Sequence, residues 1–392
     1  MMTTNTGRSL EDILEFAETL YHDAALSSVR DWKKTHPGRI AVGSMPVWAP
    51  RELIHAAGGL PVSVMGGGDD VEIIKGDAYF QSYICHIPRS TIEMGLNGSL
   101  DVLDGMIFPS ICDVIRNLSG MWKLLFPEKP AWYLDMPQSF DEIGRSFFRG
   151  ELLRIGKEMG ELAGHEITAE ALKESIAVFD RNRALLERLQ EHRLNRPWMF
   201  PISEVWSVIK AGGFIPIEEH NDLIEEYIAA AEASGRPPID NARVILVGSF
   251  CERPPLNLLR TLERSGCYVV DDDLSLGFRL IRGSVGAEGD PYQALADAFV
   301  ERSREAAFLY REGEKGKELV ARARAAHAEG VLFCAPSFCD PALLDQPMLV
   351  EAVEKAGLPW TAFKYAENTG QFQVIREQAG TFADSIKLWS VA

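Results

Sequence analysis

The sequence lacks the features that most quickly assign a function. It has no block of lysine or arginine, and its formal net charge is −17 at pH 7. We therefore expect no nucleic-acid partner, because phosphate backbones bind to basic surfaces. No G-x-x-x-x-G-K-[ST] phosphate loop occurs, and the glycine run Gly66–Gly68 does not fit G-x-G-x-x-G, so a turn is favoured there over a phosphate site. If ATP is used, another polypeptide must hydrolyse it.

Cysteine is scarce and scattered, with six residues in 392, and no C-x₂-C pair or Cys/His run has zinc spacing. The N-terminus reads as a polar tail and an amphipathic helix, without the apolar core of a signal peptide. No stretch approaches the roughly 18 apolar residues of a membrane helix. We therefore expect a cytoplasmic protein with no membrane partner, in which reduced cysteines serve as core residues, ligands or nucleophiles.

What the sequence does contain is a repeated alternation of apolar, strand-length runs with helical patterns. The expected strands are 39–45, 60–66, 103–110 and 131–137 in a first region, and 243–250, 267–273, 330–336 and 358–365 in a second. Strands that alternate with helices predict parallel sheets covered on both faces. The stretch between the regions is helical and ends at a proline- and glycine-rich linker, 234–241.

We therefore predict an α/β protein made of two doubly wound parallel-sheet domains with a bridging helical segment. The predicted boundaries are 1–140 for the N-terminal α/β domain, 141–235 for the helical segment and 236–392 for the C-terminal α/β domain. Ligands of such sheets bind beyond the carboxyl ends of the strands, so a cleft is expected where those ends face each other.

Three cysteines, Cys112, Cys251 and Cys339, share the pattern S-x-C-[DE], and each follows an apolar strand and precedes a helix. In one interpretation the serine and the acid cap the helix and the cysteine fills a small core site. In the other, the N–H groups and the positive dipole end of the helix favour a thiolate, which is the form that binds metals. The pattern alone leaves both open.

The other cysteines have different settings. Cys85 lies in the helical stretch 81–90, where Pro88 is expected to distort the helix so that its free end presents Cys85 to a cleft. Cys267 opens a strand and Cys334 lies inside one, and both are most simply core residues. Spacing alone establishes no metal site.

Five strings of the sequence resemble the cluster-binding subunits of the benzoyl-CoA reductase/2-hydroxyacyl-CoA dehydratase family. The similarity covers nearly the whole chain, and the cysteine-centred strings are specific to the family. The strings are MGGGDD (65–70), YFQSYICHIPRSTIE (79–93), GMIFPSICDVIRNLSGMWK (105–123), PSFCDPALLDQPML (336–349) and FKYAENTGQFQVIREQAGTFADSIKLW (363–389).

This resemblance implies a cofactor and its ligands. In the family, three cysteines from distant segments hold one [4Fe–4S] cluster, and they match Cys85, Cys112 and Cys339 here, which leaves one iron open. Cys251 matches no ligand and keeps the core interpretation. The implied partners are a paralogous cluster-binding subunit, ATPase subunits that activate the electron, ferredoxin as electron source, and benzoyl-CoA. ATP would be hydrolysed by the partner subunits only.

Two further sets of residues flank these segments. His86 is a candidate proton donor because it adjoins Cys85. Glu367, Asn368 and Gln371 either cap the last helix or contact substrate, so the catalytic candidates are His86, Glu367 and Gln371. The candidates for the CoA phosphates are Arg89, Arg116 and Lys123.

The resemblance implies an oxidoreductase that acts on CH–CH groups, namely an iron–sulfur subunit of ATP-dependent benzoyl-CoA reductase that reduces benzoyl-CoA to a cyclohexadiene-carbonyl-CoA. Two alternatives stay open. One is a subunit of a 2-hydroxyacyl-CoA dehydratase, a lyase with the same cluster. The other is a non-catalytic partner subunit.

Overall fold

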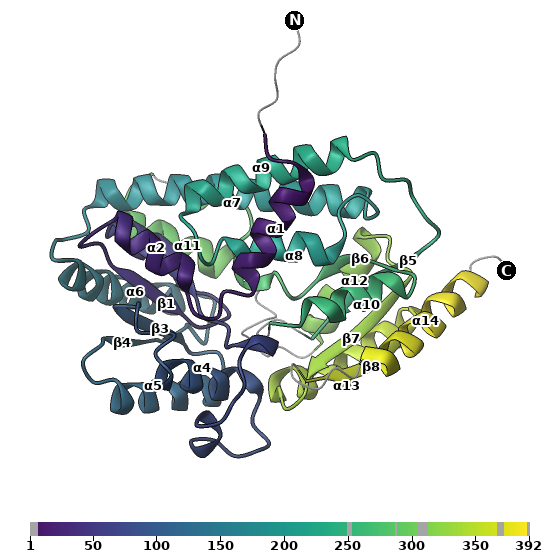
Figure 1. The fold of residues 1–392 in the computed structure, drawn as a ribbon, viewed down its shortest axis with the longest axis horizontal. Helices are drawn as coiled ribbons and strands as arrows, with labels where there is room; N and C mark the ends of the chain where they lie inside the picture. The colour runs from purple at the N-terminus through teal and green to yellow at the C-terminus, as the bar shows by residue number, and fades with distance from the viewer. Residues whose placement is uncertain (1–6, 249–252, 287, 304–312, 367–371, 390–392) are drawn as a thin grey trace, which may run out of the picture.

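The computed structural model describes residues 7–248, 253–286, 288–303, 313–366 and 372–389 (Figure 1). It contains two four-stranded parallel sheets, with strand orders β2-β1-β3-β4 and β6-β5-β7-β8. In each sheet the first strand lies in an inner position, the chain moves to one edge and then crosses to the other side. The prediction of an α/β fold with two doubly wound parallel sheets is confirmed.

All eight stretches that were expected to be strands contain one, although several strands are shorter than expected and β5 begins one residue earlier, at Ala242. The strands of the first sheet are β1 (Ala41–Ser44), β2 (Leu60–Ser63), β3 (Gly105–Pro109) and β4 (Ala131–Leu134). Those of the second are β5 (Ala242–Val247), β6 (Cys267–Asp272), β7 (Gly330–Pro336) and β8 (Trp360–Tyr365). Every residue of β7 is buried, as expected for an inner strand covered on both faces.

Helices cover both faces of each sheet. The N-terminal region contains α1 (Leu10–Tyr21), α2 (Ser27–Thr35), α3 (Arg51–Ala56), α4 (His86–Leu96) and α5 (Asp113–Leu125), with the 3₁₀ turns η1 (Gly68–Asp70) and η2 (Gly76–Ala78). The bridging helices are α6 (Glu142–Ala163), α7 (Ala169–Asn195), α8 (Ile202–Ala211) and α9 (Ile217–Ala233). Of the N-terminal helices, α1 packs against the bridging helices α8 and α9. The second sheet is followed or flanked by α10 (Leu256–Arg264), η3 (Leu276–Phe278), α11 (Pro291–Arg302), α12 (Glu314–Ala325), α13 (Asp340–Lys355) and α14 (Phe372–Trp389).

Local signals set the ends of the bridging helices. The Asp141 carboxylate accepts the N–H groups of Ile143 and Gly144 at the start of α6, which ends at Gly164 in the left-handed region, with φ 80°. Thr168 caps α7 in the same way, by accepting the N–H of Ala171. Such caps satisfy the amide groups that the first turn of a helix leaves unpaired.

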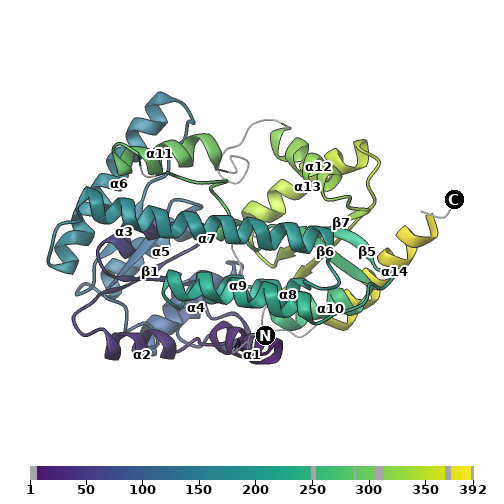
Figure 2. The ribbon, with the colours of Figure 1, turned by 90° about the horizontal axis from the view of Figure 1, so that it is seen from above.

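The bridging helices join the two halves of the molecule. Figure 2 shows α7 running along the length of the protein, and α7 contacts both α3 and β6. One continuous core contains Val62 from the first sheet, Trp206 from α8, and Leu246 from the second sheet. α11 follows the second sheet in the chain but packs against α6. This shared core holds the carboxyl ends of the two sheets in a defined relation.

A buried histidine ties three of the bridging helices together. His220 on α9 is fully buried; one ring nitrogen lies 3.0 Å from the Asn182 side-chain amide on α7, and the other lies 3.1 Å from the Val208 carbonyl on α8. Burial, and to a smaller extent the nearby Arg51, lower the pKa of His220 to about 3, although the contact with Val208 acts to raise it. The imidazole is therefore neutral in the folded protein at pH 7.

This histidine should make stability fall in mild acid. Its folded pKa lies below the unfolded value of about 6.5, so the unfolded chain takes up the proton first, and stability is lost as the pH falls from about 6.5 towards 3. Between pH 7 and pH 5 the unmutated chain should lose about 2 kcal/mol more free energy of unfolding than His220→Gln. Urea unfolding of both proteins at the two pH values measures this difference, and equal losses would contradict the assignment.

Candidate functional site

Three of the cysteines stand immediately before helices. Cys85, Cys112 and Cys339 are the N-terminal cap residues of α4, α5 and α13. Cys112 lies three residues beyond the end of β3, and Cys339 three residues beyond the end of β7. The prediction that these two sulfurs lie at strand ends and helix starts is therefore confirmed. Each thiol lies near the unpaired N–H groups and the positive dipole end of a helix.

The surroundings of Cys85 differ from the expectation. We expected Cys85 to lie within a helix distorted by Pro88, but α4 begins only at His86. Pro88 is in the first turn, where its missing N–H has no intrahelical partner to lose, so it does not distort the helix. Cys85 is half-buried at the helix start, which brings it into the same local setting as the other two cysteines.

The capping interpretation of the S-x-C-[DE] pattern is wrong for Ser110. Its hydroxyl accepts the N–H of Met136 at 2.7 Å and so joins the ends of β3 and β4, while Cys112 occupies the cap position. Asp340 is likewise not the cap residue of α13, because the helix begins at Asp340 itself. The pattern correctly indicated the starts of α5 and α13, where the cap is two residues later than a capping box would place it, whereas the helix after the Cys251 copy begins only at Leu256.

Cys112 lies close to the helix that begins after Cys339. Burial raises the pKa of the Cys112 thiol, the backbone N–H groups of Ile115 and Val114 lower it, and the carboxylates of Asp113 and Asp340 raise it. Asp340 is the first residue of α13, so the charge at the start of a helix of the second sheet acts on Cys112 of the first. The helix that follows Cys85, α4, also contacts α5.

The three sulfurs do not form a compact site for a single ion. Within the described residues, they do not form a group whose ligand atoms all lie within 4.8 Å of one another. A single zinc ion would need closer donors, because its Zn–S bonds are only about 2.3 Å long. Thiolates that bind different irons of one cluster occupy separate corners of it and need no mutual contact. Thiols are donors of the kind that iron–sulfur clusters use, and the three here come from both halves of the molecule.

The remaining cysteines divide into two cases. Cys267 and Cys334 are buried in the core, and burial raises the pKa of the Cys267 thiol to about 12, so the core interpretation is confirmed for both. The five described cysteines are all free of disulfide bonds. Cys251 lies outside the described residues, as do Glu367, Asn368 and Gln371.

The structure also locates the candidate proton donor and the candidate residues for the CoA phosphates. His86 is the first residue of α4 and is buried beside Cys85. Arg89 pairs with Asp77 at 2.7 Å, so its charge already has a partner. Arg116 and Lys123 lie on α5, a turn or more beyond Cys112.

The glycine run forms a tight turn against α4. Gly66 and Gly68 have φ values of 69° and 56°, which glycine adopts without strain. A Cβ atom on Gly66 would lie 2.5 Å from the Ser90 hydroxyl and 3.1 Å from the Ile87 Cα, both on α4. The turn interpretation is confirmed, and this turn supports the helix that follows Cys85.

Gly66→Ala should therefore lower the free energy of unfolding more than the same change at a glycine that has a positive φ but no close neighbours. Gly38 is the matched control, since its φ is 82° and nothing lies within 4 Å of the position that a methyl group would occupy there. Gly38→Ala should lose roughly 1–2 kcal/mol of stability, and Gly66→Ala should lose about 1–3 kcal/mol more because the contact with α4 is overpacked. Urea unfolding of the two variants measures this difference. Equal losses of stability would contradict the conclusion that the turn at Gly66 supports α4.

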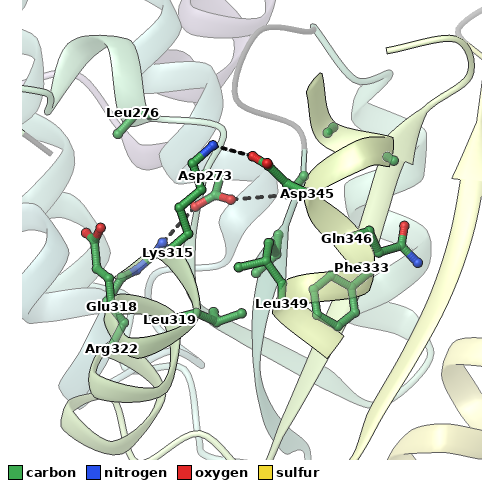
Figure 3. A pocket seen from close by; sticks show the side chains of 14 residues that line it. Asp273, Leu276, Lys315, Glu318, Leu319, Arg322, Phe333, Asp345, Gln346 and Leu349 are labelled. Carbon is green, nitrogen blue, oxygen red and sulfur yellow. Dashed lines mark hydrogen bonds and ion pairs between the residues drawn. The ribbon is translucent and has the colours of Figure 1, made fainter. Parts of the chain in front are cut away.

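A cavity of about 90 Å³ lies at the carboxyl ends of β5 and β7, between α12 and α13 (Figure 3). This is the switch point of the second sheet, where doubly wound folds commonly bind ligands. Lys315 pairs with Asp345 and Arg322 pairs with Asp273 at its rim. The apolar side chains of the wall are Val247, Leu276, Leu319, Phe333 and Leu349.

This cavity adjoins Cys339. Ala335 and Ala342 line the cavity, and both pack in one small buried cluster with Cys339. An apolar group in the cavity would therefore lie beside the segment that carries this thiol. Because the rim cations have carboxylate partners, the cavity favours an apolar group over a phosphate.

A second cavity, of about 30 Å³, lies between the carboxyl ends of the two sheets. Ser44 and Met45 line it from the end of β1, and Leu274 and Phe278 line it from the segment after β6. The expected meeting of strand ends is confirmed here. Arg51 also lines this cavity, although sequence analysis did not single it out. The available signal was an arginine only a few residues beyond a strand end.

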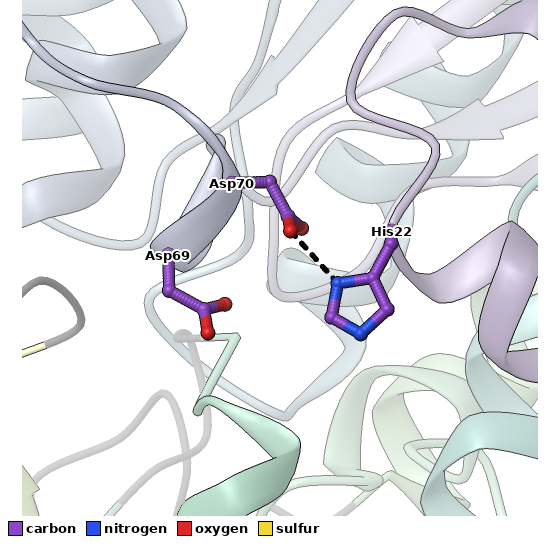
Figure 4. Close-up of side chains that lie close together, drawn as sticks. All are labelled: His22, Asp69 and Asp70. Carbon is purple, nitrogen blue, oxygen red and sulfur yellow. Dashed lines mark hydrogen bonds and ion pairs between the residues drawn. The ribbon is translucent and has the colours of Figure 1, made fainter. Parts of the chain in front are cut away.

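His22, Asp69 and Asp70 form an exposed group whose ligand atoms lie within 4.8 Å of one another (Figure 4). His22 contacts Asp70 at 2.8 Å, and Asp70 also pairs with Arg253. The ion pairs account for the positions of His22 and Asp70 without a metal, and the oxygen and nitrogen donors of the group are not those of an iron–sulfur cluster.

Comparisons with known proteins place these features in a family context. The model of the family described as the 2-hydroxyglutaryl-CoA dehydratase D-component matches residues 46–386. The chain is 51% identical over 385 residues to the C subunit of benzoyl-CoA reductase from Thauera aromatica, an alignment that covers 97% of this chain and 100% of that relative.

More distant relatives match over similar lengths. The chain is 27% identical to the beta subunit of (R)-phenyllactyl-CoA dehydratase from Clostridium sporogenes, over 89% of this chain and 92% of that protein. It is 26% identical to the beta subunit of (R)-2-hydroxyglutaryl-CoA dehydratase from Acidaminococcus fermentans, over 89% and 93%. None of the described helices has the length and apolar character needed to cross a membrane.

Proposed function

The chain belongs to the 2-hydroxyglutaryl-CoA dehydratase D-component family, and we propose that it is the iron–sulfur C subunit of an ATP-dependent benzoyl-CoA reductase. In this role it takes part in the dearomatising reduction of benzoyl-CoA to a cyclohexadiene-carbonyl-CoA, as an oxidoreductase acting on CH–CH groups. The observation that carries the proposal is the 51% identity along the whole of the benzoyl-CoA reductase relative, compared with 27% and 26% to the dehydratase beta subunits.

The proposed cofactor is one [4Fe–4S] cluster held by Cys85, Cys112 and Cys339. Such a cluster supplies one-electron transfer at a potential that its burial and the hydrogen bonds to its sulfurs determine. The position of each thiol before a helix supports the assignment, because N–H groups and the helix dipole stabilise a thiolate. The partial burial of Cys112 and the burial of Cys339 would exclude bulk water from the site.

The proposed working form is a cytoplasmic hetero-oligomer with a paralogous cluster-binding subunit and with ATPase subunits that receive electrons from ferredoxin. The relatives' names support the need for partners, because each is a subunit of a larger enzyme. We also propose domain boundaries at 140/141 and 235/236. The ends of the bridging helices support them, since α6 begins at Glu142 and α9 ends at Ala233.

His86, Glu367 and Gln371 remain proposed catalytic residues. Only His86 lies among the described residues, and its burial beside Cys85 supports a role in delivering a proton near that thiol. The second candidate function is that of a 2-hydroxyacyl-CoA dehydratase subunit, which would make the enzyme a lyase. The dehydratase name of the matching family model favours it.

An assay of the purified complex separates these two functions. The complex should be prepared without oxygen and given ATP, a low-potential reductant, and either benzoyl-CoA or a 2-hydroxyacyl-CoA such as lactoyl-CoA. We expect benzoyl-CoA to be consumed together with a stoichiometric amount of reductant. Dehydration of the 2-hydroxyacyl-CoA with only catalytic reductant, and no turnover of benzoyl-CoA, would establish the lyase instead.

A further inference from the structure

The cavity of about 30 Å³ between the two sheets is lined by an arginine whose side chain has no hydrogen-bonded partner among the described residues. Arg51 lines the cavity, and its side chain donates no hydrogen bond to any residue in the described part of the chain. Its Nη1 atom is shielded from solvent and unpaired. A buried polar group normally has a hydrogen-bond partner, so this exception calls for an explanation.

Two aromatic rings hold the guanidinium of Arg51 in place. Its Cζ lies 5.2 Å from the ring centre of Phe179 and 5.1 Å from that of Phe278. Such contacts stabilise the cation through the faces of the rings but leave the N–H groups in the guanidinium plane without acceptors. The arginine is thus oriented before any ligand binds.

The neighbouring charges are engaged with each other rather than with Arg51. Glu52 pairs with Arg183 at 2.7 Å, and Arg183 pairs also with Asp180 at 2.7 Å. Burial lowers the pKa of Arg51 to about 10, while Glu52 raises it and Arg183 lowers it. The other close titratable group, His220, is neutral at pH 7 because its own pKa is lowered. Arg51 therefore stays cationic at pH 7.

The cavity has polar and apolar walls that suit a small acyl group. The polar residues Ser44 and Ser63 line it together with the apolar side chains of Trp48, Met65 and Phe278. A cavity of about 30 Å³ holds roughly two water-sized probes. This volume accommodates a carbonyl or carboxylate group rather than a whole aromatic ring.

The cavity also borders the segments that lead to two of the cysteines. The N–H of Met45 donates to the carbonyl of Ile107 at 2.9 Å, on the strand that precedes Cys112. The Thr91 hydroxyl lies 4.0 Å from the Met45 sulfur, on the helix that follows Cys85. Arg51 is thus located at the same edge of the first sheet as Cys112, and the helix that follows Cys85 contacts the same segment.

We propose that Arg51 binds the carbonyl oxygen of an acyl thioester in this cavity. This inference rests on the proposed function, which supplies an acyl-CoA substrate. The carbonyl oxygen gains negative charge when an electron enters the conjugated acyl group, and a preoriented guanidinium stabilises that charge through two N–H donors. A free carboxylate or inorganic phosphate shares the required chemistry, so the test includes both.

The test measures binding to the anaerobic complex by calorimetry, with benzoyl-CoA, lactoyl-CoA, benzoate, free coenzyme A and inorganic phosphate as probes. The variants are Arg51→Gln, which removes the charge, and Arg51→Lys, which keeps the charge but loses the forked geometry. Arg39→Gln is the control, because Arg39 is exposed and lies away from both cavities. Iron content and thermal midpoint are recorded for each protein.

We expect Arg51→Gln to weaken benzoyl-CoA binding at least tenfold while free coenzyme A, which lacks the carbonyl, binds as before and iron content is unchanged. Arg51→Lys should retain part of the affinity. Unchanged benzoyl-CoA binding in both variants would overturn the proposal, as would Arg51-dependent binding of phosphate alone. If lactoyl-CoA, but not benzoyl-CoA, binds with the same dependence on Arg51, the arginine site stands and the proposed substrate is wrong.

Discussion

Serine in place of Cys85, Cys112 or Cys339 is expected to abolish the cluster signal and to lower benzoyl-CoA reduction more than about 100-fold. Loss of a residue that only supports a metal ligand already costs about 10–100-fold in affinity or activity, and loss of the ligand itself should cost more. A serine hydroxyl is a poor substitute because the soft thiolate is the ligand that iron–sulfur clusters require. Iron content and the absorbance and paramagnetic resonance spectra of the anaerobic protein measure the result.

Cys267 and Cys334 provide matched controls within the same chain. Both are buried core residues, and serine there should cost roughly 1–3 kcal/mol of stability through an unsatisfied hydroxyl. Iron content should stay near the unmutated level. Cys251→Ser should behave in the same way, because the helix after it begins only at Leu256, beyond two prolines. Iron loss in Cys251→Ser together with a normal cluster in Cys85→Ser would show that Cys251, and not Cys85, is the third ligand.

The purified chain alone is expected to give no detectable reduction of benzoyl-CoA with an ordinary reductant in the absence of ATP. Its sequence contains no phosphate loop for ATP, and an aromatic ring accepts electrons only at a very low potential. Adding the paralogous subunit, the ATPase subunits and ATP should restore turnover. Formation of the cyclic diene product, followed by chromatography, measures the difference.

The control for this experiment is the complete complex with ATP replaced by a non-hydrolysable analogue, which should be as inactive as the isolated chain. Ring reduction by the isolated chain without ATP would show that electron activation does not depend on partners. That result would contradict the proposed need for partner subunits, but it would not affect the assignment of the cysteine ligands.

Much of the fold followed from the sequence because strand-length apolar runs between helical patterns specify a parallel sheet with little ambiguity. Runs such as GVLFCAP at 330–336 became strands with the expected ends. The placement of Cys112 and Cys339 was predictable for the same reason, since the ends of parallel strands and the starts of the following helices lie at one edge.

Other features depended on contacts between distant segments. Ser110 fits a capping pattern locally, but its hydroxyl accepts the N–H of Met136, just beyond the end of the neighbouring strand. The position of Pro88 could not be judged until the start of α4 was known to be His86. The only local signal for Arg51 was its position shortly after a strand end, because the two aromatic rings that contact it, Phe179 and Phe278, lie far away in the chain. Contacts between residues that are far apart in the chain produce no repeating pattern in a single sequence, so they could not be predicted from it.

The most direct test of the central claim is an anomalous difference map, recorded at the iron absorption edge from crystals of the complex grown without oxygen. The account predicts a compact iron peak enclosed by the sulfurs of Cys85, Cys112 and Cys339, between the carboxyl ends of the two sheets. The absence of iron from this chain, or a peak at Cys251 without Cys85 or at His22, Asp69 and Asp70, would contradict it.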